Sequence, residues 1–224
     1  MRPGLFITFE GLDGTGKSTQ LRRVVRYLRE RGYHVMVTRE PGGTPTGERI
    51  RDILLGSKTH RIAPLTELAL MYASRAQLLA DVVRPALSQG EVVVSDRYNT
   101  ASFAYQGCGR ELGTSTVRAF DRVICGETQS DLTIILDLAP DVALRRALGR
   151  GERRSARLDR IEIQGLEFHA RVRAGYLLAA RRAPDRIKVV DADQSIDELQ
   201  RQIRALIDPF LAERQTSKQK KCHS

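Results

Sequence analysis

A glycine-rich segment near the N-terminus is the feature that most constrains this 224-residue chain. Residues 11–18 read Gly-Leu-Asp-Gly-Thr-Gly-Lys-Ser and match the pattern G-x-x-x-x-G-K-[ST] without a gap. An apolar segment typical of a β-strand, residues 5–9, comes directly before the match, and a helical segment, residues 19–31, follows it. Phosphate-binding loops occur between a strand and a helix, so the sequence predicts an α/β fold with a P-loop.

Each residue type in this loop suits the binding of phosphate. Glycines let the backbone curl around phosphate oxygens with its N–H groups pointing inward. The helix that follows turns its N-terminus, with a partial positive charge, toward the anion. Lys17 can reach the β- and γ-phosphates, and Ser18 can ligate Mg²⁺.

Five segments are candidate strands, and helical patterns separate them. Four have the composition of buried strands, and residues 34–39 match it least. The strands are expected at residues 5–10, 34–39, 91–95, 132–138 and 187–191. The helices are expected at residues 19–31, 44–55, 64–89, 114–126, 141–149, 161–182 and 195–213. This alternation predicts a five-stranded parallel sheet flanked by helices, in a single domain of residues 1–213. Ligands of such sheets bind beyond the carboxyl ends of the strands.

The composition argues against several classes of protein. No apolar run approaches the ~20 residues that span a bilayer, and the first strand begins too early for a signal peptide to precede it. Three cysteines at unrelated spacings form neither a disulfide framework nor a metal pattern, so we expect a cytoplasmic protein. The net charge of +10 would suit nucleic acid, but it lies largely in residues 145–160 and in a basic tail, residues 214–224. The tail has no apolar periodicity and is expected to be disordered, so a nucleic-acid partner is the less favoured interpretation.

Charged residues follow the second and third expected strands. Asp96 suits Mg²⁺, directly or through water, and Arg97 suits a second anion because a guanidinium binds phosphate in a fork. A surface ion pair between these two residues, or a helix cap, is the alternative. With Arg39, Arg75 and the arginines of residues 145–160, this edge has more cations than one phosphate site needs. The surplus favours two phosphorylated ligands that face each other.

The segment of residues 149–160 is polar, dense in arginine and interrupted by glycine. This composition predicts a mobile lid that folds over phosphates when a ligand binds. A solvated loop between two helices is the alternative interpretation.

Five motifs in order carry a resemblance to a known family. They are Glu-Gly-Leu-Asp-Gly-Thr-Gly-Lys-Ser-Thr at residues 10–19, Thr-Arg-Glu-Pro-Gly-Gly-Thr at 38–44, Asp-Arg-Tyr at 96–98, Ala-Tyr-Gln at 104–106 and Leu-Asp-Arg-Ile-Glu at 158–162. Over about the first 210 residues the chain closely resembles thymidylate kinases of the bacterial type. The resemblance implies transfer of the γ-phosphoryl group of ATP to thymidine 5′-monophosphate (dTMP), which gives dTDP and ADP. It also implies Mg²⁺ and a homodimer packed through helices of the middle third.

The resemblance assigns roles to the matching residues. The loop would hold the phosphates of ATP through Gly11, Leu12, Asp13, Gly14, Thr15, Gly16, Lys17 and Ser18, and Ser18 and Asp96 would hold Mg²⁺. In the dTMP site, Arg97 and Arg39 would bind the phosphate, Asp13 would accept from the sugar 3′-hydroxyl, and Tyr105 would lie against the sugar. Arg75 would bind the thymine carbonyl edge, with Ser102 on the far side of the base. Met71 and Gln106 would complete the site. Lys17 and Arg97 would also act in catalysis.

Two positions distinguish this chain within the resemblance. Position 14 is glycine, where some members carry an arginine that assists transfer, so the helping arginine is expected in the lid. Arg150 is the first choice, with Arg153 and Arg154 as alternates. Met71 stands where the family usually has a phenylalanine that stacks on thymine. The sulfur of Met71 can pack on a ring, and Tyr72 is a second candidate for stacking on thymine. The alternative interpretation is that Met71 is a core residue of its helix.

Three other functions are compatible with parts of the sequence. One is another nucleotide kinase or a deoxynucleoside kinase on the same scaffold. A kinase that acts on a nucleoside would not need a clamp for a monophosphate, so it would depend less on Arg97. A nucleic-acid-dependent ATPase would need a basic groove lined with aromatic residues, and the chain has no Trp and 5% aromatic residues. A binding module without turnover is disfavoured by the intact Lys17, Ser18 and Asp96 and by the lid arginines.

Overall fold

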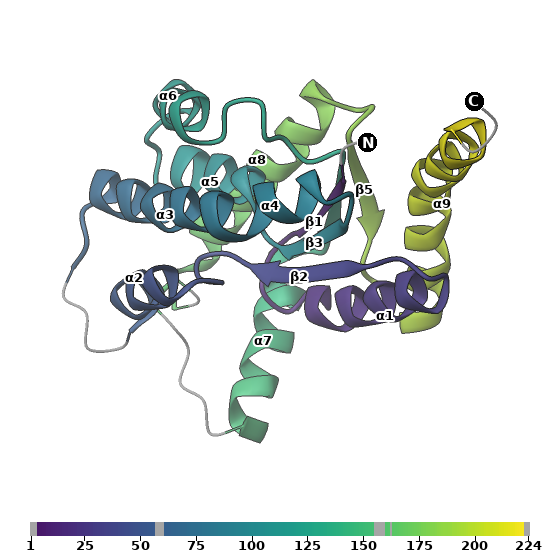
Figure 1. The fold of residues 1–224 in the computed structure, drawn as a ribbon. Helices are drawn as coiled ribbons and strands as arrows, with labels where there is room; N and C mark the ends of the chain where they lie inside the picture. Colours follow the sequence, from purple (N-terminus) through teal and green to yellow (C-terminus); the bar gives the residue numbers. More distant parts are fainter. Residues whose placement is uncertain (1–3, 57–60, 155–159, 162, 222–224) are drawn as a thin grey trace.

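The fold is an α/β sandwich built on one parallel sheet (Figure 1). The computed structural model describes residues 4–56, 61–154, 160–161 and 163–221, and within these it does not describe the side chains of residues 150–154, 213 and 215–221. The strands are β1 (Leu5–Glu10), β2 (Val35–Arg39), β3 (Val92–Asp96), β4 (Leu132–Asp137) and β5 (Ile187–Asp191). They pair in the order β2-β3-β1-β4-β5, all parallel, which confirms the predicted sheet.

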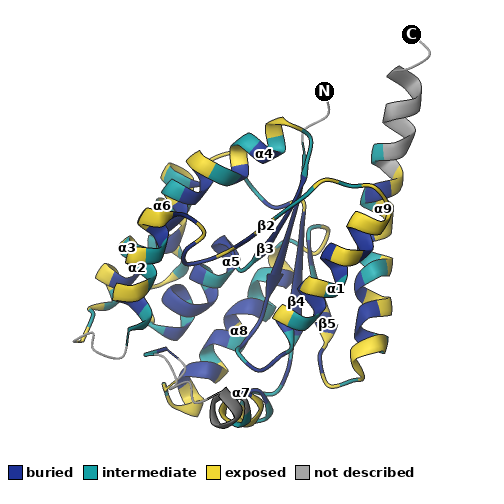
Figure 2. Cartoon of the chain, turned by 60° about the horizontal axis from the view of Figure 1, so that its bottom comes forward, coloured by how far each residue is buried: buried dark blue, intermediate teal, exposed yellow. Residues whose placement is uncertain are grey.

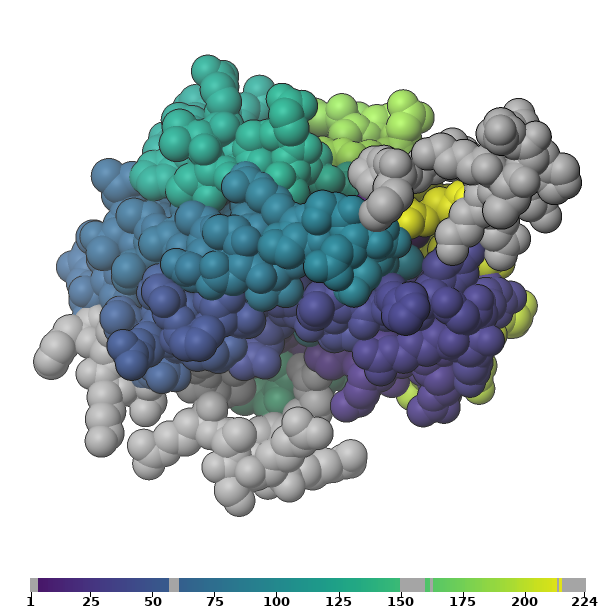
Figure 3. All heavy atoms as spheres, viewed as in Figure 1, coloured from purple at the N-terminus to yellow at the C-terminus, as the bar shows by residue number. Residues whose placement is uncertain are grey.

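Helices cover both faces of this sheet, as the predicted fold requires. They are α1 (Lys17–Glu30), α2 (Pro45–Leu55), α3 (Pro64–Leu78), α4 (Arg84–Ser88), α5 (Asn99–Ser102), α6 (Thr114–Ile124), α7 (Pro140–Arg154), α8 (Leu166–Arg182) and α9 (Ile196–Lys221), with π-helical turns η1 (Leu79–Val83) and η2 (Phe103–Gly109). Helices α1 and α9 lie on one face, and α3, α4, α5, α6 and α8 lie on the other (Figure 2). Atoms of α1 to α4 make up most of the face seen in Figure 3.

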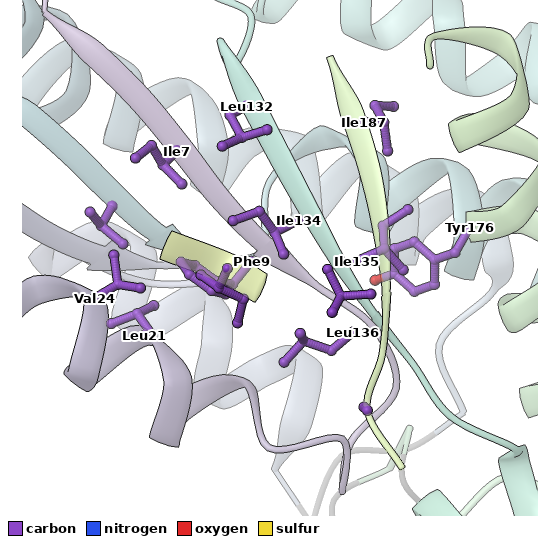
Figure 4. Close-up of a cluster of buried hydrophobic side chains, with 14 of the residues drawn as sticks. Ile7, Phe9, Leu21, Val24, Leu132, Ile134, Ile135, Leu136, Tyr176 and Ile187 are labelled. Atoms are coloured by element: carbon purple, nitrogen blue, oxygen red, sulfur yellow. The ribbon is translucent and has the colours of Figure 1, made fainter. Parts of the chain in front are cut away.

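Burial on both faces explains why the strands are nearly uniform in their apolar character. Along β1, Ile7 and Phe9 point toward α1, whereas Phe6 points toward the helices of the opposite face. All six residues of β1 are buried, as in a central parallel strand. Figure 4 shows the core on the α1 side, where Leu21 and Val24 pack against the sheet.

The helical segment of residues 99–109, which contains α5 and η2, was not expected from the sequence. Its glycines and lack of a capping residue disfavour a helix. The structure shows why glycine is needed: a Cβ at Gly109 would lie 2.7 Å from Val172 Cγ2, and a Cβ at Gly175 would lie 2.9 Å from Ala104 Cα. Close packing of α8 on η2 therefore outweighs the local preference.

Two helices extend beyond their predicted ends. Helix α7 continues through Gly149 to Arg154, so the backbone at the start of the expected lid is helical. Helix α9 continues to Lys221, where the sequence favoured a disordered tail. The extension of α7 is rich in Arg and that of α9 in Lys and Gln, which are good helix formers even without an apolar face. Residues 155–159, the rest of the expected lid except Arg160, lie outside the described residues.

The carboxyl ends of the parallel strands lie at one edge of the sheet. β1 lies between β3 and β4, at the point where the order of the strands switches from one side of the sheet to the other. The loop of residues 11–16 follows β1 at this edge. Asp96 ends β3, the strand next to β1, and Arg39 ends β2 on the far side of β3. In the described part of the chain, no helix has the length and apolar character needed to cross a membrane.

Candidate active site

The glycines of the loop after β1 adopt backbone conformations that other residues avoid. Gly11, Gly14 and Gly16 have φ values of 126°, 93° and 93°. A Cβ at Gly14 would lie 2.0 Å from the Ala143 carbonyl oxygen, and one at Gly11 would lie 2.4 Å from the Leu136 carbonyl oxygen. Positive φ and close backbone approach together require glycine here, and they fix the curl that the sequence pattern predicted.

Lys17 begins α1 and folds back over the loop. Its Nζ donates to the carbonyl oxygens of Gly11 at 3.1 Å and Leu12 at 2.8 Å, and it lies 3.4 Å from Asp13 Oδ1. Burial and the charge of Arg97 lower the pKa of this ammonium group. A phosphate bound in the loop would give this buried cation a stronger partner than two neutral carbonyls.

Asp13 and Arg97 form an ion pair at the mouth of the loop. Arg97 Nη2 lies 2.8 Å from Asp13 Oδ1. Burial alone would raise the pKa of Asp13, but the charges of Arg97 and Lys17 hold it well below its usual range. The carboxylate is therefore ionised throughout the physiological range and is an acceptor beside two cations.

Arg97 has an unusual backbone for a residue with a side chain. Its φ is 73°, in the left-handed region, and its guanidinium also donates to the Gly11 carbonyl oxygen at 3.0 Å and to the Tyr176 hydroxyl at 3.1 Å. Non-glycine residues in this region are concentrated at functional sites, where the surrounding structure holds them. The sequence identified Arg97 but not this conformation.

A cavity of about 220 Å³ adjoins the loop and collects most of the predicted residues. Predicted residues in its lining are Asp13, Gly14, Gly16, Lys17, Ser18, Arg39, Met71, Arg75, Asp96, Arg97, Ser102, Tyr105 and Gln106, and further lining residues are Glu40, Pro41, Arg51, Leu55, Ala101 and Ile161. Of the predicted loop residues, Gly11, Leu12 and Thr15 are not part of this lining. The side chains of Arg150, Arg153 and Arg154 lie outside the described part of the chain.

Arg75 lies at the deep end of this cavity and is 2% exposed. Its Nε and Nη2 donate to Glu40 Oε2 at 2.8 and 2.6 Å, and Nη2 also donates to Ser102 Oγ at 3.1 Å. The resemblance implied that Arg75 and Ser102 lie on opposite sides of the base. In this structure the two side chains are hydrogen-bonded to each other and form one corner of the cavity. Among the described residues, Arg75 Nη1 has no hydrogen-bond partner, so the buried guanidinium keeps one donor for a ligand.

The residues expected around the base and sugar fall into two groups. Met71 and Tyr105 line the cavity, and the Tyr105 ring lies 4.9 Å from the Arg97 guanidinium. Tyr72 does not line it, because its side chain is fully buried and its hydroxyl lies 3.4 Å from the Val117 carbonyl oxygen. Tyr72 is therefore a core residue, and Met71 alone stands at the expected stacking position.

Arg39 lies at the rim, where the exposed fraction of its side chain is 53%. Its Nη2 donates to both oxygens of Glu48, at 2.9 and 2.8 Å. Backbone N–H of Gly43 donates to the same carboxylate at 2.8 Å. Arg39 is thus paired with Glu48 at the entrance of the cavity, and its side chain is more exposed than that of Arg97.

Behind the cavity, Glu67 is a buried hub that the sequence did not reveal. It is 1% exposed and accepts hydrogen bonds from Gln106 at 2.8 Å, Arg160 at 2.5 Å and Arg110 at 3.2 Å. Burial alone would raise the pKa of Glu67, but these hydrogen bonds and the charge of Arg110 lower it below its ordinary value. Its partners come from segments 39 to 93 residues away, so no local motif marks it.

We expect Glu67→Gln to lower the free energy of unfolding by about 3 kcal/mol at pH 7, because two largely covered guanidinium groups lose the buried counter-charge that they share. Urea denaturation measures the change. Because folding lowers the pKa of Glu67, its carboxylate stabilises the protein above the pKa of the unfolded chain. The difference between the variant and the unmodified chain should therefore shrink as the pH falls into the acid range where Glu67 takes up a proton. The exposed pair of Arg23 and Asp197 gives the control, because Arg23→Gln should change stability by less than about 1 kcal/mol. Equal losses for both variants would contradict the account of the hub.

A second hollow adjoins the other side of the loop, and most of its residues were not predicted. Its lining joins Gly14, Thr15 and Gly16 to Thr19, Gln20, Arg146, Gly149, Ala192, Gln194, Ile196 and Leu199. Arg146 donates to Asp193 Oδ1 at 2.7 Å and to the Ala192 carbonyl oxygen at 3.3 Å. The arginine-rich composition pointed to phosphates, whereas Arg146 is tied to the turn between β5 and α9.

Comparison with known proteins adds independent evidence. Residues 9–203 match the family model described as thymidylate kinase. A curated thymidylate kinase of Pseudomonas putida is 47% identical over 211 residues, covering 94% of this chain and 98% of that protein. One of Caulobacter vibrioides is 47% identical over 197 residues, covering 88% and 92%. The crystal structure of thymidylate kinase from Ehrlichia chaffeensis superposes with a TM-score of 0.73 at 30% identity, covering 92% of this chain and 99% of that one. The chain belongs to the thymidylate kinase family.

Proposed function

We propose that the loop, the cavity and the second hollow hold ATP and dTMP end to end for the reaction of this family. The chain is a dTMP kinase, which phosphorylates dTMP to dTDP in nucleotide biosynthesis. The observation that carries the proposed arrangement is the ion pair between Asp13 in the phosphate-binding loop and Arg97 after β3. Asp13 Oδ1 lies 2.8 Å from Arg97 Nη2, so the loop is in direct contact with a cation that can bind the second phosphate. One loop can thereby contact both substrates.

ATP is the donor, and we assign its phosphates to residues 11–18. Lys17 would leave the Gly11 and Leu12 carbonyls for the β- and γ-phosphates. The second hollow, on the other side of Gly14 and Gly16, would hold the nucleoside part of ATP beside Arg146 and Gln194. The reason is continuity: a nucleotide with its phosphates in the loop needs a neighbouring hollow for its base.

We assign Mg²⁺ to Ser18 and Asp96, which are already in contact. Ser18 Oγ donates to Asp96 Oδ2 at 3.2 Å. Among the described residues, no cluster of three or more His, Cys, Asp or Glu could hold a metal by itself. A hydroxyl and a carboxylate, completed by phosphate oxygens and water, suit Mg²⁺. When bound, the ion would neutralise charge on the phosphates.

For dTMP, we assign the phosphate to Arg97, with Arg39 at the rim. The Arg97 side chain is 15% exposed, and its guanidinium donates to the Gly11 carbonyl oxygen, the Tyr176 hydroxyl and Asp13. The guanidinium could exchange Asp13 for a phosphate. The Asp13 carboxylate, kept ionised by its neighbours, would then accept a hydrogen bond from the sugar 3′-hydroxyl. Tyr105 would lie against the sugar.

At the base end, we assign the thymine carbonyl edge to Arg75 and Ser102, with Gln106 beside them. The ion pair with Glu40 neutralises Arg75, so this corner suits an uncharged carbonyl better than a second phosphate. The unpaired Nη1 supplies the donor. Met71 would pack against the ring through its thioether.

The remaining assignments rest on the sequence. One of Arg150, Arg153 and Arg154 would stabilise the group in transfer, with Arg150 as first choice. A homodimer would pack through helices of the middle third, and the exposed Leu65 on α3 and Val123 on α6 support apolar contact there. A cytoplasmic location also stays a prediction.

Met71→Ala tests the assignment at the base. We expect KM for dTMP to rise about tenfold while kcat stays within about threefold, because the lost contact is the same in ground and transition states. Steady-state kinetics at saturating ATP measures both constants. A fall in kcat with an unchanged KM would remove Met71 from the base site.

The acceptor specificity tests the proposed arrangement as a whole. Purified protein with Mg-ATP is supplied in turn with dTMP, dUMP, dCMP, AMP, GMP and thymidine, and ADP formation is measured. We expect dTMP to be the best acceptor and thymidine to be inactive, because the nucleoside has nothing to bind Arg97. Preference for another monophosphate, or activity with thymidine equal to that with dTMP, would contradict the proposal.

A further inference from the structure

Glu10, the last residue of β1, has no part in the assignments above. Its side chain is 0% exposed, directly behind the phosphate-binding loop. Each oxygen of its carboxylate accepts one hydrogen bond: Oε1 from the backbone N–H of Tyr98 at 2.8 Å, and Oε2 from the Tyr176 hydroxyl at 2.9 Å. A buried carboxylate costs stability unless its partners compensate, and here both partners lead to Arg97.

The first of these hydrogen bonds acts on the backbone of Arg97. This residue has a φ of 73°, and the peptides on both sides of it are held. Its N–H donates to the Phe9 carbonyl oxygen at 2.9 Å, and its own carbonyl oxygen accepts from Ser95 Oγ at 2.6 Å. The next N–H, that of Tyr98, is the one that Glu10 accepts. Glu10 therefore supplies one of three hydrogen bonds that maintain a backbone conformation unfavourable to arginine.

The second hydrogen bond acts on the side chain of Arg97. The Tyr176 hydroxyl has one hydrogen, and donating it to Glu10 leaves only lone pairs for other partners. Arg97 Nη1 donates to this oxygen at 3.1 Å. Figure 4 shows Tyr176 reaching from α8 toward the sheet, which brings the hydroxyl to the edge where Glu10 ends β1. An ionised Glu10 thus turns the hydroxyl so that it accepts from the guanidinium.

We propose that Glu10 is a positioning residue that holds the backbone and the guanidinium of Arg97 in the conformation that binds the dTMP phosphate. The proposal rests on the assignment of that phosphate to Arg97 under the proposed function. Glu10 itself contacts neither substrate, since it does not line the cavity.

The charges around Glu10 connect this role to pH. Burial raises the pKa of Glu10 to about 7, against the charge of Arg97 and the hydrogen bonds from Tyr176 and Tyr98. The negative charge of Glu40, which follows β2, raises the pKa of Glu10 further. A proton on Glu10 would convert one acceptor into a donor, and one of the two links to Arg97 would be lost. The affinity of Arg97 for the dTMP phosphate should therefore decrease as the pH falls through 7.

The test is calorimetric binding of dTMP and of thymidine to the full chain and to Glu10→Gln. At pH 8 we expect the variant to bind dTMP about tenfold more weakly and thymidine within about twofold of the unmodified protein. At pH 6 the difference for dTMP should close to within about twofold, because the unmodified residue is then protonated. Equal weakening of dTMP and thymidine, or a difference that is independent of pH, would overturn the proposal.

Two tyrosine variants separate positioning from loss of stability. Tyr176→Phe removes the side-chain link alone and should weaken dTMP by about threefold at pH 8. Tyr27→Phe removes a hydroxyl that contacts Asp208 on the other face of the sheet, and it should leave both affinities unchanged. These two variants decide the question even if Glu10→Gln fails to fold. Arg97→Gln belongs in the same assay: if it leaves dTMP affinity unchanged, the proposed function fails, whereas a loss there without one at Glu10 and Tyr176 refutes this inference alone.

Discussion

Lys17→Met lowers kcat by about 1000-fold, and this is the largest effect that we expect from a substitution in the donor site. The methionine keeps the length of the side chain but loses the three donors that lie over the Gly11 and Leu12 carbonyls. Charge on the transferring phosphoryl group would then have one fewer cation to neutralise it. Initial rates of ADP formation at saturating dTMP measure the effect.

A matched substitution on the same helix controls for the loss of charge. Arg26 is exposed on α1, so Arg26→Met should leave kcat within about twofold. Binding of dTMP to Lys17→Met should also be preserved, because that site depends on Arg97. If Lys17→Met retained a tenth or more of the activity, the loop would not hold the transferring phosphate as assigned.

Arg97→Gln lowers kcat/KM for dTMP by about 1000-fold, mostly through KM. The glutamine loses the guanidinium that lies 2.8 Å from Asp13 and 3.0 Å from the Gly11 carbonyl oxygen. A phosphate would then enter a site whose nearest charge is the Asp13 carboxylate, which repels it. Arg97→Lys should recover only part of the loss, because an ammonium group cannot bind phosphate in a fork.

The binding of ADP gives the control for this variant. We expect ADP affinity to stay within about threefold in Arg97→Gln, because the donor loop is formed by the backbone of residues 11–18. Isothermal titration with ADP and with dTMP makes the comparison directly. Parallel losses for both nucleotides would mean that Arg97 supports the loop and does not bind the acceptor.

The elements that the sequence predicted best are those whose signal is local. The expected strand at residues 5–10 agrees with β1. The one at residues 34–39 begins one residue before β2, and the one at residues 91–95 is shifted by one residue from β3. Runs of apolar residues specify buried parallel strands without reference to distant partners. The loop of residues 11–18 could be predicted equally well, because the spacing of its glycines, lysine and serine is specific to one backbone conformation.

The features that sequence reasoning missed depend on contacts between distant segments. Residues 99–109 form a helix because glycines let α8 pack closely on it, and no pattern within that segment records this. Glu67 has partners from η2 and from residue 160, and Glu10 meets Tyr176 at a separation of 166 residues. In the sequence, Glu67 belongs to no motif, and Glu10 is the first residue of one but has no role assigned to it. Their roles depend on burial, which one sequence does not specify.

The central claim is that one loop brings the two substrates together at Asp13 and Arg97. A crystal structure of the protein with dTMP and a non-hydrolysable ATP analogue tests it most directly. The account predicts a dTMP phosphate oxygen within about 3 Å of the Arg97 guanidinium, the 3′-hydroxyl at the Asp13 carboxylate, and the analogue's phosphates on the N–H groups of residues 11–18. A dTMP phosphate bound to Arg39 or elsewhere, with Arg97 still paired to Asp13, would contradict it.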